Sequence, residues 1–99
     1  MATTSKALYR GLLTTGTLYT VPSGKTVVVT SIIVANTTAS ATTFSIGFGG
    51  YSAFETVAIA AKTSVVIDTK QVLNAGDIID AGVGASFSCN IHINGVEIA

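Results

Sequence analysis

The most regular pattern in the chain is an alternation of apolar and polar positions with a period of two. Between residues 42 and 49, Phe44, Ile46 and Phe48 alternate with small or polar residues. This alternation is typical of an antiparallel strand that has one face in the core and the other in solvent. Residues 86–98 begin with the same alternation, so both segments are predicted to be half-buried strands.

Extended segments separated by turn residues recur along the whole chain. Pro22–Gly24 and residues 73–77 supply turns, because proline fixes φ and glycine tolerates a positive φ. No stretch of helical length has a period of 3.6, and the turn signals are spaced as in sandwiches and barrels. Strands are therefore predicted at residues 7–13, 17–21, 25–37, 42–49, 54–60, 63–69, 78–80 and 86–98.

These patterns predict a single all-β domain, an antiparallel sandwich or jelly-roll of seven to eight strands. A chain of 99 residues is large enough for one core and too short for two. Residues 1–6 are small and polar and offer almost no apolar surface to offset the entropy of ordering. We therefore expect a flexible N-terminal arm over residues 1–6 and the sandwich domain over residues 7–99.

The longest predicted strand, residues 25–37, has apolar residues on both faces. A one-residue bulge at residues 30–31 would bring onto one face Val27, Val29, Ile32 and Val34. Val28 and Ile33 would still point the other way. Two interpretations stay open: the loop 49–53 covers these two side chains, or another subunit does. Because burying such a side chain is worth about 1.5–3 kcal/mol, we expect Val28 and Ile33 to lie in a subunit contact.

The last strand contains a change of phase. Up to Ile93 its odd-numbered residues are apolar, but after Gly95 the apolar residues are Val96 and Ile98. A β-bulge at Gly95 would explain the change, because one extra residue turns all later side chains to the other face.

Charge and cysteine usage narrow the classes of partner. Only 10% of the residues are charged, and five basic and five acidic residues give a net charge of zero. Nucleic-acid binding is not expected, since it needs clustered lysine and arginine. A surface with so little self-repulsion favours association. The single cysteine, Cys89, allows no intrachain disulfide, which indicates folding in a reducing compartment. Neither a membrane span nor a signal peptide is expected.

Residues that could carry chemistry are few and scattered. His92 is the only histidine and is predicted on a polar strand face, so one chain does not supply the usual zinc ligand sets. Asp77 and Asp80 are a close carboxylate pair, but Asp77 fits a turn role. The glycine-rich stretch "GFGGYSAF" is not followed by a helix and so fails as a phosphate loop. We therefore expect no catalytic residue, no cofactor, no metal and no enzymatic activity.

Three stretches carry a resemblance to a known class of proteins. "LYTVPSGKTVVVTSIIVANTTASATTFSI", "VLNAGDII" and "INGVEI" resemble parts of small β-rich virion proteins of tailed bacteriophages, over about residues 18–98. The resemblance implies a virion structural protein, commonly trimeric. Modules of this kind occur as capsid decoration (cement) proteins and as lobes of fibres. The chain has neither coiled-coil heptads nor a repetitive shaft, which favours a decoration protein over a fibre.

The expected function is thus a homotrimeric decoration protein that binds between major capsid proteins and stabilises the shell. Its expected place is the capsid surface of the virion, after assembly in the host cytoplasm. The alternative is a tail- or head-fibre module that binds a host surface glycan or protein. The main capsid contact is predicted in the N-terminal segment, at Lys6, Leu8, Tyr9 and Arg10, because aromatic and arginine side chains often anchor interfaces and Arg10 is the only arginine. Otherwise Leu8 and Tyr9 only begin the first strand, and Arg10 is a solvated edge charge.

Overall fold

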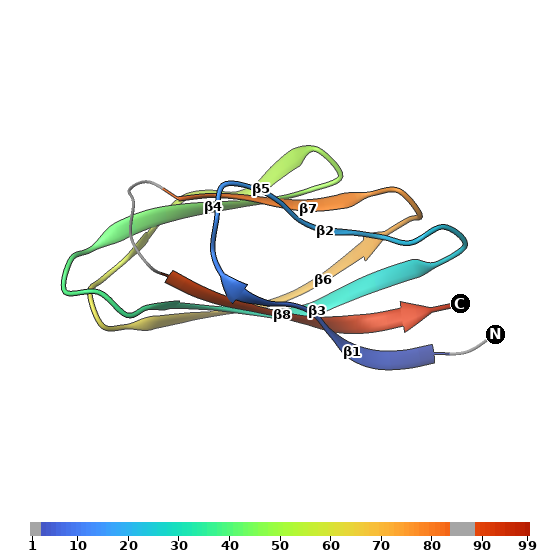
Figure 1. Ribbon diagram of the computed structural model, residues 1–99, viewed down its shortest axis with the longest axis horizontal. Helices are drawn as coiled ribbons and strands as arrows, with labels where there is room; N and C mark the ends of the chain where they lie inside the picture. The colour runs from blue at the N-terminus through green and yellow to red at the C-terminus, as the bar shows by residue number, and fades with distance from the viewer. Residues whose placement is uncertain (1–2, 84–88) are drawn as a thin grey trace.

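A computed structural model describes residues 3–83 and 89–99 of the chain. Within these residues, eight strands and no helix form two antiparallel four-stranded sheets stacked face to face (Figure 1). Sheet A contains, in spatial order, β1 (Thr3–Leu12), β8 (Cys89–Ile98), β3 (Thr26–Asn36) and β6 (Ser64–Leu73). Sheet B contains β2 (Gly16–Thr20), β7 (Ile78–Val83), β4 (Thr42–Phe48) and β5 (Tyr51–Ile59). The all-β sandwich predicted from the sequence is confirmed.

The strand order is that of a jelly-roll. β1 pairs with β8, β2 with β7, β3 with β6 and β4 with β5, so the chain is folded like one long hairpin whose turn joins β4 to β5. Rolling this hairpin up adds the pairings of β3 with β8 and of β4 with β7. Two sheets are thereby closed over one core, which is one of the two arrangements that the sequence predicted.

The core consists of the apolar residues that alternate along the inner faces of the two sheets. Sheet B contributes Phe44, Ile46 and Phe48, as their alternation predicted. Sheet A contributes residues of β3 and β8 that are fully buried: Val27, Val29, Ile32, Val34, Cys89, Ile91 and Ile93. The two inner faces fill the space between the sheets, which stack about 10 Å apart in sandwiches.

The bulge predicted in the longest strand is present. The pairing of β3 with β8 shifts between Val29 and Ser31, which leaves Thr30 as the extra residue on that side. On the β6 side the shift has the opposite sense, because Thr30 lies opposite two residues, Thr69 and Lys70. Residues on either side of the shift can therefore face the core together. Val28 and Ile33 point to the other side of sheet A, as expected.

The bulge predicted at Gly95 is wrong. β8 continues without an extra residue, and the shifts lie instead in its two neighbours, at Leu8 in β1 and at Thr30 in β3. Gly95 lies between these bulges, where a Cβ atom would collide with the Val28 carbonyl oxygen and lie 2.9 Å from Leu8 Cδ1. The glycine is thus required by close approach of the neighbouring strands, and Val96 faces away from the core.

The flexible arm expected over residues 1–6 is also not what the structure has. Thr3 to Lys6 form the first part of β1 and pair with β8, beginning with Thr3 opposite Ile98. Backbone hydrogen bonds in the ladder order these polar residues, which their side chains alone would not do. Residues 1–2 of the expected arm lie outside the described residues.

The stretch 49–53, considered as a cover for Val28 and Ile33, lies on the wrong sheet. Gly49 and Gly50 form the β4–β5 turn, with positive φ values of 61° and 89° that favour glycine. β5 already begins at Tyr51. Figure 1 shows this turn beyond sheet B, on the side away from sheet A. It therefore does not cover the outer face of sheet A.

Candidate functional site

The outer face of sheet A, meaning the side turned away from sheet B, carries a row of valines. Val28 in β3 lies opposite Val72 in β6 and Val96 in β8. Directly opposite residues of antiparallel strands project from the same face, with Cβ atoms about 4.5–5.5 Å apart. Val72 is 57% exposed, and the other two are half-buried. The row is a small aliphatic stripe in contact with solvent.

A second row crosses the same face two residues beyond the bulges. It runs from Arg10 in β1 through His92 in β8 and Ile33 in β3 to Val66 in β6. Val66 is 65% exposed, and Arg10 is exposed at the edge of the sheet. Val28, Ile33 and Arg10, three of the six residues predicted at interfaces, therefore share one surface.

A third, mostly polar row lies between the valine row and the row from Arg10 to Val66. It consists of Ala7, Asn94, Ser31 and Asp68, in the order β1, β8, β3 and β6. The Asn94 side-chain amide donates to Ser31 Oγ at 3.4 Å. Asp68 is exposed at the β6 edge of the sheet. The outer face of sheet A thus has aliphatic side chains on both sides of a polar row, with Arg10 exposed at the β1 edge and Asp68 and Lys70 exposed at the β6 edge.

The other predicted residues of the N-terminal segment do not lie on this face. Leu8 is 8% exposed and belongs to the core. Tyr9 is half-buried against the core, and its hydroxyl donates to the Leu12 carbonyl at 2.8 Å. Leu8, Tyr9 and Arg10 therefore do not form one anchor. The alternative interpretation agrees with the structure in that Leu8 and Tyr9 belong to the first strand and Arg10 is an exposed edge charge, but the strand begins at Thr3 rather than at Leu8.

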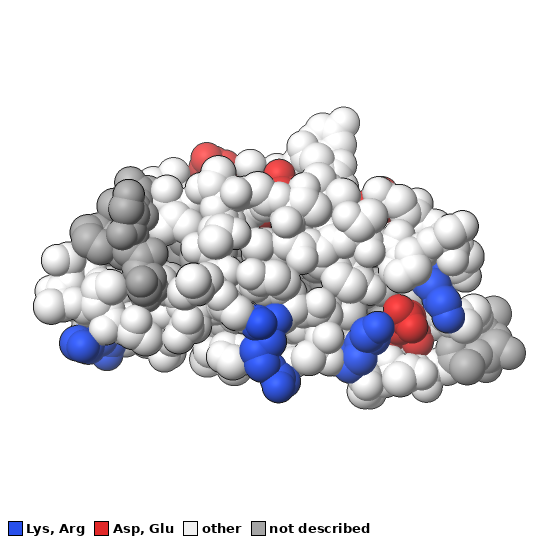
Figure 2. Space-filling view, viewed as in Figure 1, with Lys and Arg blue, Asp and Glu red and all other residues white. Residues whose placement is uncertain are grey.

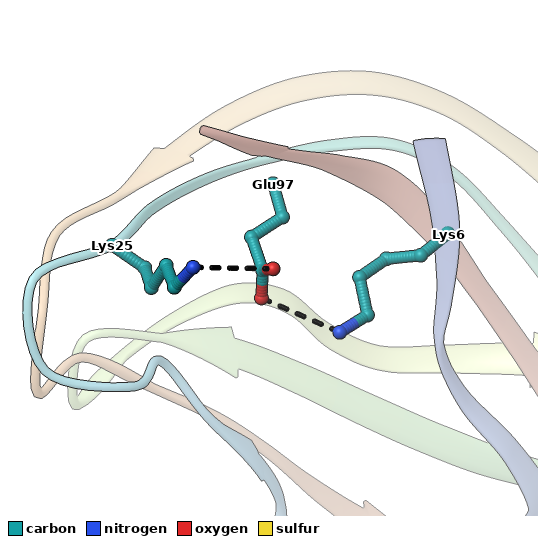
Figure 3. A network of polar contacts seen from close by, with 3 residues as sticks. All are labelled: Lys6, Lys25 and Glu97. Atoms are coloured by element: carbon teal, nitrogen blue, oxygen red, sulfur yellow. Dashed lines mark hydrogen bonds and ion pairs between the residues drawn. The ribbon is translucent and has the colours of Figure 1, made fainter. Parts of the chain in front are cut away.

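Lys6 is held in an ion-pair network with Glu97 and Lys25 (Figure 3). Its ammonium lies 3.3 Å from Glu97 Oε2, and that of Lys25 lies 4.0 Å from Glu97 Oε1. The network links β1, β8 and the turn before β3. Burial raises the pKa of Tyr19, with Lys6 lowering and Glu97 raising it to a smaller extent. Because exposed ion pairs contribute about 0–1 kcal/mol to the free energy of unfolding, the network stabilises this end of the sandwich only weakly.

Sheet B has a polar outer face with a shallow groove that the sequence patterns did not indicate. The groove is lined by Ser45, Gly47, Ser52, Glu55, Asp80, Ala81 and Gly82. A side chain at position 47 would collide with Asp80 Oδ1 and the Tyr51 carbonyl, so the glycine keeps the groove open. Asp80 Oδ1 is buried and accepts no hydrogen bond from the described residues. Gly47 and Asp80 are opposite each other only through the β4–β7 pairing, which no local pattern announces.

The other candidate groups are kept apart by the fold. Asp77 caps a turn, because its Oδ2 accepts a hydrogen bond from the backbone N–H of Asn74 at 2.9 Å. Asp80 lies in the groove on sheet B. Cys89 faces the core, where burial raises the pKa of its thiol, and His92 faces outward from the same strand. In residues 3–83 and 89–99, no three of the histidine, cysteine, aspartate and glutamate side chains gather as metal ligands would.

Val66 and Val72 were not singled out from the sequence, although a signal for Val66 exists. Val65, Val66 and Ile67 are consecutive apolar residues, and Val65 and Ile67 pack against the core. Val66 is therefore out of phase with its neighbours in the same way as Val28. Figure 2 shows basic side chains spaced along the sheet A side of the molecule, with an acidic group between those on the right.

None of the described residues forms a helix with the length and apolar character needed to span a bilayer. Comparisons of the chain with protein-family models, with curated proteins and with solved structures found no match.

Proposed function

We propose that the protein is a non-enzymatic structural protein of a tailed-phage virion, a capsid decoration protein that binds between major capsid proteins and stabilises the shell. The observation that carries the proposal is the outer face of sheet A, where Val28, Val66 and Val72 remain in contact with solvent. Several exposed aliphatic side chains on one face favour an interaction site. The resemblance of the sequence to small virion proteins supplies the class of assembly.

The low charge of the chain supports the same proposal. Only 10% of the residues are charged. A protein that stays bound in a shell needs little of the charge repulsion that keeps free monomers apart. Burying each aliphatic side chain of the outer face is worth up to about 1.5–3 kcal/mol. Contacts of this size, repeated over a lattice of capsid subunits, would stabilise a shell.

The test is to purify particles of the phage that encodes the chain and to measure its copy number relative to the major capsid protein by quantitative mass spectrometry. A decoration protein is expected at a copy number comparable to that of the capsid protein, and cryo-electron microscopy should place it on the shell. Add-back of purified protein to particles lacking it should raise their thermal stability. Absence from particles, or a copy number typical of a tail component, would contradict the proposal.

Two variants make the add-back experiment specific. Val28→Lys places a charge in the valine row of sheet A, whereas Thr43→Lys places one on the outer face of sheet B. Both positions are half-buried and lie near the beginning of an inner strand of their sheet, so the variants are matched. Val28→Lys is expected to reduce binding to particles, and Thr43→Lys to retain it. The reverse result would move the binding surface to sheet B.

A fibre module that binds a host glycan is the second candidate, and the groove on sheet B favours it. Asp80 and Glu55 place two carboxylates in the groove, and Tyr51, whose carbonyl lies beside Gly47, has an 82% exposed side chain. Aromatic rings and carboxylates are frequent in such sites. Binding to a glycan array that is lost in Asp80→Asn would support this candidate over the first.

A further inference from the structure

We infer that the outer face of sheet A is covered by the same face of a second copy of the chain, related by a two-fold axis that runs parallel to the strands. The inference goes beyond the proposed function and does not rest on it: it names the partner that covers this face in the free protein, a partner that capsid subunits would have to displace. It departs from the trimer expected from the sequence, since face-to-face packing of this kind closes with two copies.

The first argument is the position of two charges that have no partner of their own. Arg10 lies in β1 and Asp68 in β6, at opposite edges of the same face. Three strand spacings of about 4.8 Å separate these strands, so the two side chains start about 14 Å apart, too far for an ion pair. Within residues 3–83 and 89–99, neither charge takes part in an ion pair.

A rotation about the proposed axis brings these charges together. An axis parallel to the strands, placed between β8 and β3, lays β1 of each copy over β6 of the other. Arg10 of one copy then faces the part of β6 that holds Val66 and Asp68 of the other, because Arg10 and Val66 share a row and Asp68 lies in the next. Two equivalent contacts between Arg10 and Asp68 result. A two-fold axis perpendicular to the strands would instead lay β1 over β1 and leave these charges unpaired.

The remaining side chains of the face agree with this arrangement. Val28 in β3 comes to lie over Val96 in β8 of the other copy, so the valine rows pack on each other. Lys70, the other charge of the β6 edge, lies between the rows of Asp68 and Val72. It therefore faces the small residues of the other β1, near Ser5, rather than Arg10.

The size of the face also suits a pair of copies. Four strands about 4.8 Å apart, with about eight residues at roughly 3.3 Å each, give a face of about 500 Å² per copy. Two such faces bury about 1,000 Å² in total, which is at the lower limit for a specific interface. The expected dimer is therefore weak, with dissociation in the micromolar range, and electrostatic pairing at its rim contributes to its specificity.

Charge reversal in purified protein tests the pairing directly. Sedimentation velocity over the micromolar range should show a monomer–dimer equilibrium for the unaltered protein. Arg10→Asp and Asp68→Arg each set like charges against each other twice, and each is expected to weaken the dimer at least about tenfold. The double variant Arg10→Asp/Asp68→Arg should restore it. Circular dichroism of each variant controls for folding. Glu55→Lys is a matched charge reversal on sheet B and should leave the monomer–dimer equilibrium unchanged.

Mixing the two single variants provides a second test that a merely structural effect would not pass. In a mixed pair the two exchanged residues face each other at one contact, and the two unaltered residues at the other. An equimolar mixture should therefore dimerise when neither variant does so alone. The inference would be overturned by a protein that is monomeric at all concentrations, or by a trimer that neither charge reversal weakens. It would also be overturned if neither the double variant nor the mixture formed the dimer. Because no particle is involved, these results are independent of whether the protein decorates a shell.

Discussion

Gly95 offers the sharpest test of the packing in sheet A. It sits in β8 between the bulge of β1 and that of β3. In Gly95→Ala the new methyl group would collide with the Val28 carbonyl oxygen and approach Leu8 Cδ1 to 2.9 Å. Leu8 can rotate away, but the Val28 carbonyl is part of the backbone of a central strand. Relief therefore requires β3 and β8 to move apart locally.

The expected magnitude follows from two opposing effects. Overpacking in a rigid site costs about 1–3 kcal/mol, and a collision with backbone belongs at the upper end of that range. Replacing glycine by alanine also restricts the unfolded chain, which returns about 0.4–1 kcal/mol. The net loss in the free energy of unfolding should be about 2 kcal/mol. For a domain of this size, that loss lowers the urea midpoint by about 1–2 M.

Equilibrium unfolding in urea, followed by circular dichroism, is the assay, and Gly82→Ala is the matched control. Gly82 also lies inside a strand, β7, and its φ is outside the positive range, but the atom nearest to the methyl group of an alanine at this position would be Ser45 Cβ, at 4.0 Å. That variant should be neutral or stabilised by up to about 1 kcal/mol. If both variants unfold at the same urea concentration, the close approach of β3 to Gly95 does not exist in solution.

Three further predictions concern stability. Leu8→Ala should lower the free energy of unfolding by about 2–5 kcal/mol, because Leu8 is only 8% exposed. Leu12→Ala changes a 53% exposed residue of the same strand and should cost less than about 0.5 kcal/mol. Equal urea midpoints for the two variants would mean that β1 is not packed on the core. Asn36→Ala removes a buried side-chain amide that donates to the Ser40 carbonyl at 2.8 Å. Thermal unfolding should show a free energy of unfolding lower by about 1–3 kcal/mol, and an unchanged Tm would contradict this role. Burial raises the pKa of the Cys89 thiol, so the folded state holds its proton more tightly than the unfolded state does. The free energy of unfolding should then fall as pH rises past the ordinary thiol pKa of about 8.5. Cys89→Ala should be about 1 kcal/mol less stable at neutral pH, and its stability should fall less steeply at alkaline pH than that of the unaltered protein.

The candidate site was predictable only in part. Val28 and Ile33 were found because they are apolar and out of phase with the core positions of their own strand. Asp68 was missed because its importance depends on lying across the sheet from Arg10, and strand order is a long-range property. Leu8 was assigned to a contact with another protein because its residue type suits an interface as well as a core.

The sequence by itself determined the approximate positions of eight strands, the core-facing side of β3, β4 and the first part of β8, and the bulge in β3, because side-chain alternation is local and has a fixed period of two. Only the tertiary structure decided how the phase change near Gly95 is accommodated: the extra residues lie in the two neighbouring strands, at Leu8 and Thr30. Likewise, the polar residues from Thr3 to Lys6 are ordered by backbone hydrogen bonds to β8, which no side-chain pattern encodes. Pairing between strands distant in the chain sets register and neighbours, and these decide which outward-facing residues share a surface.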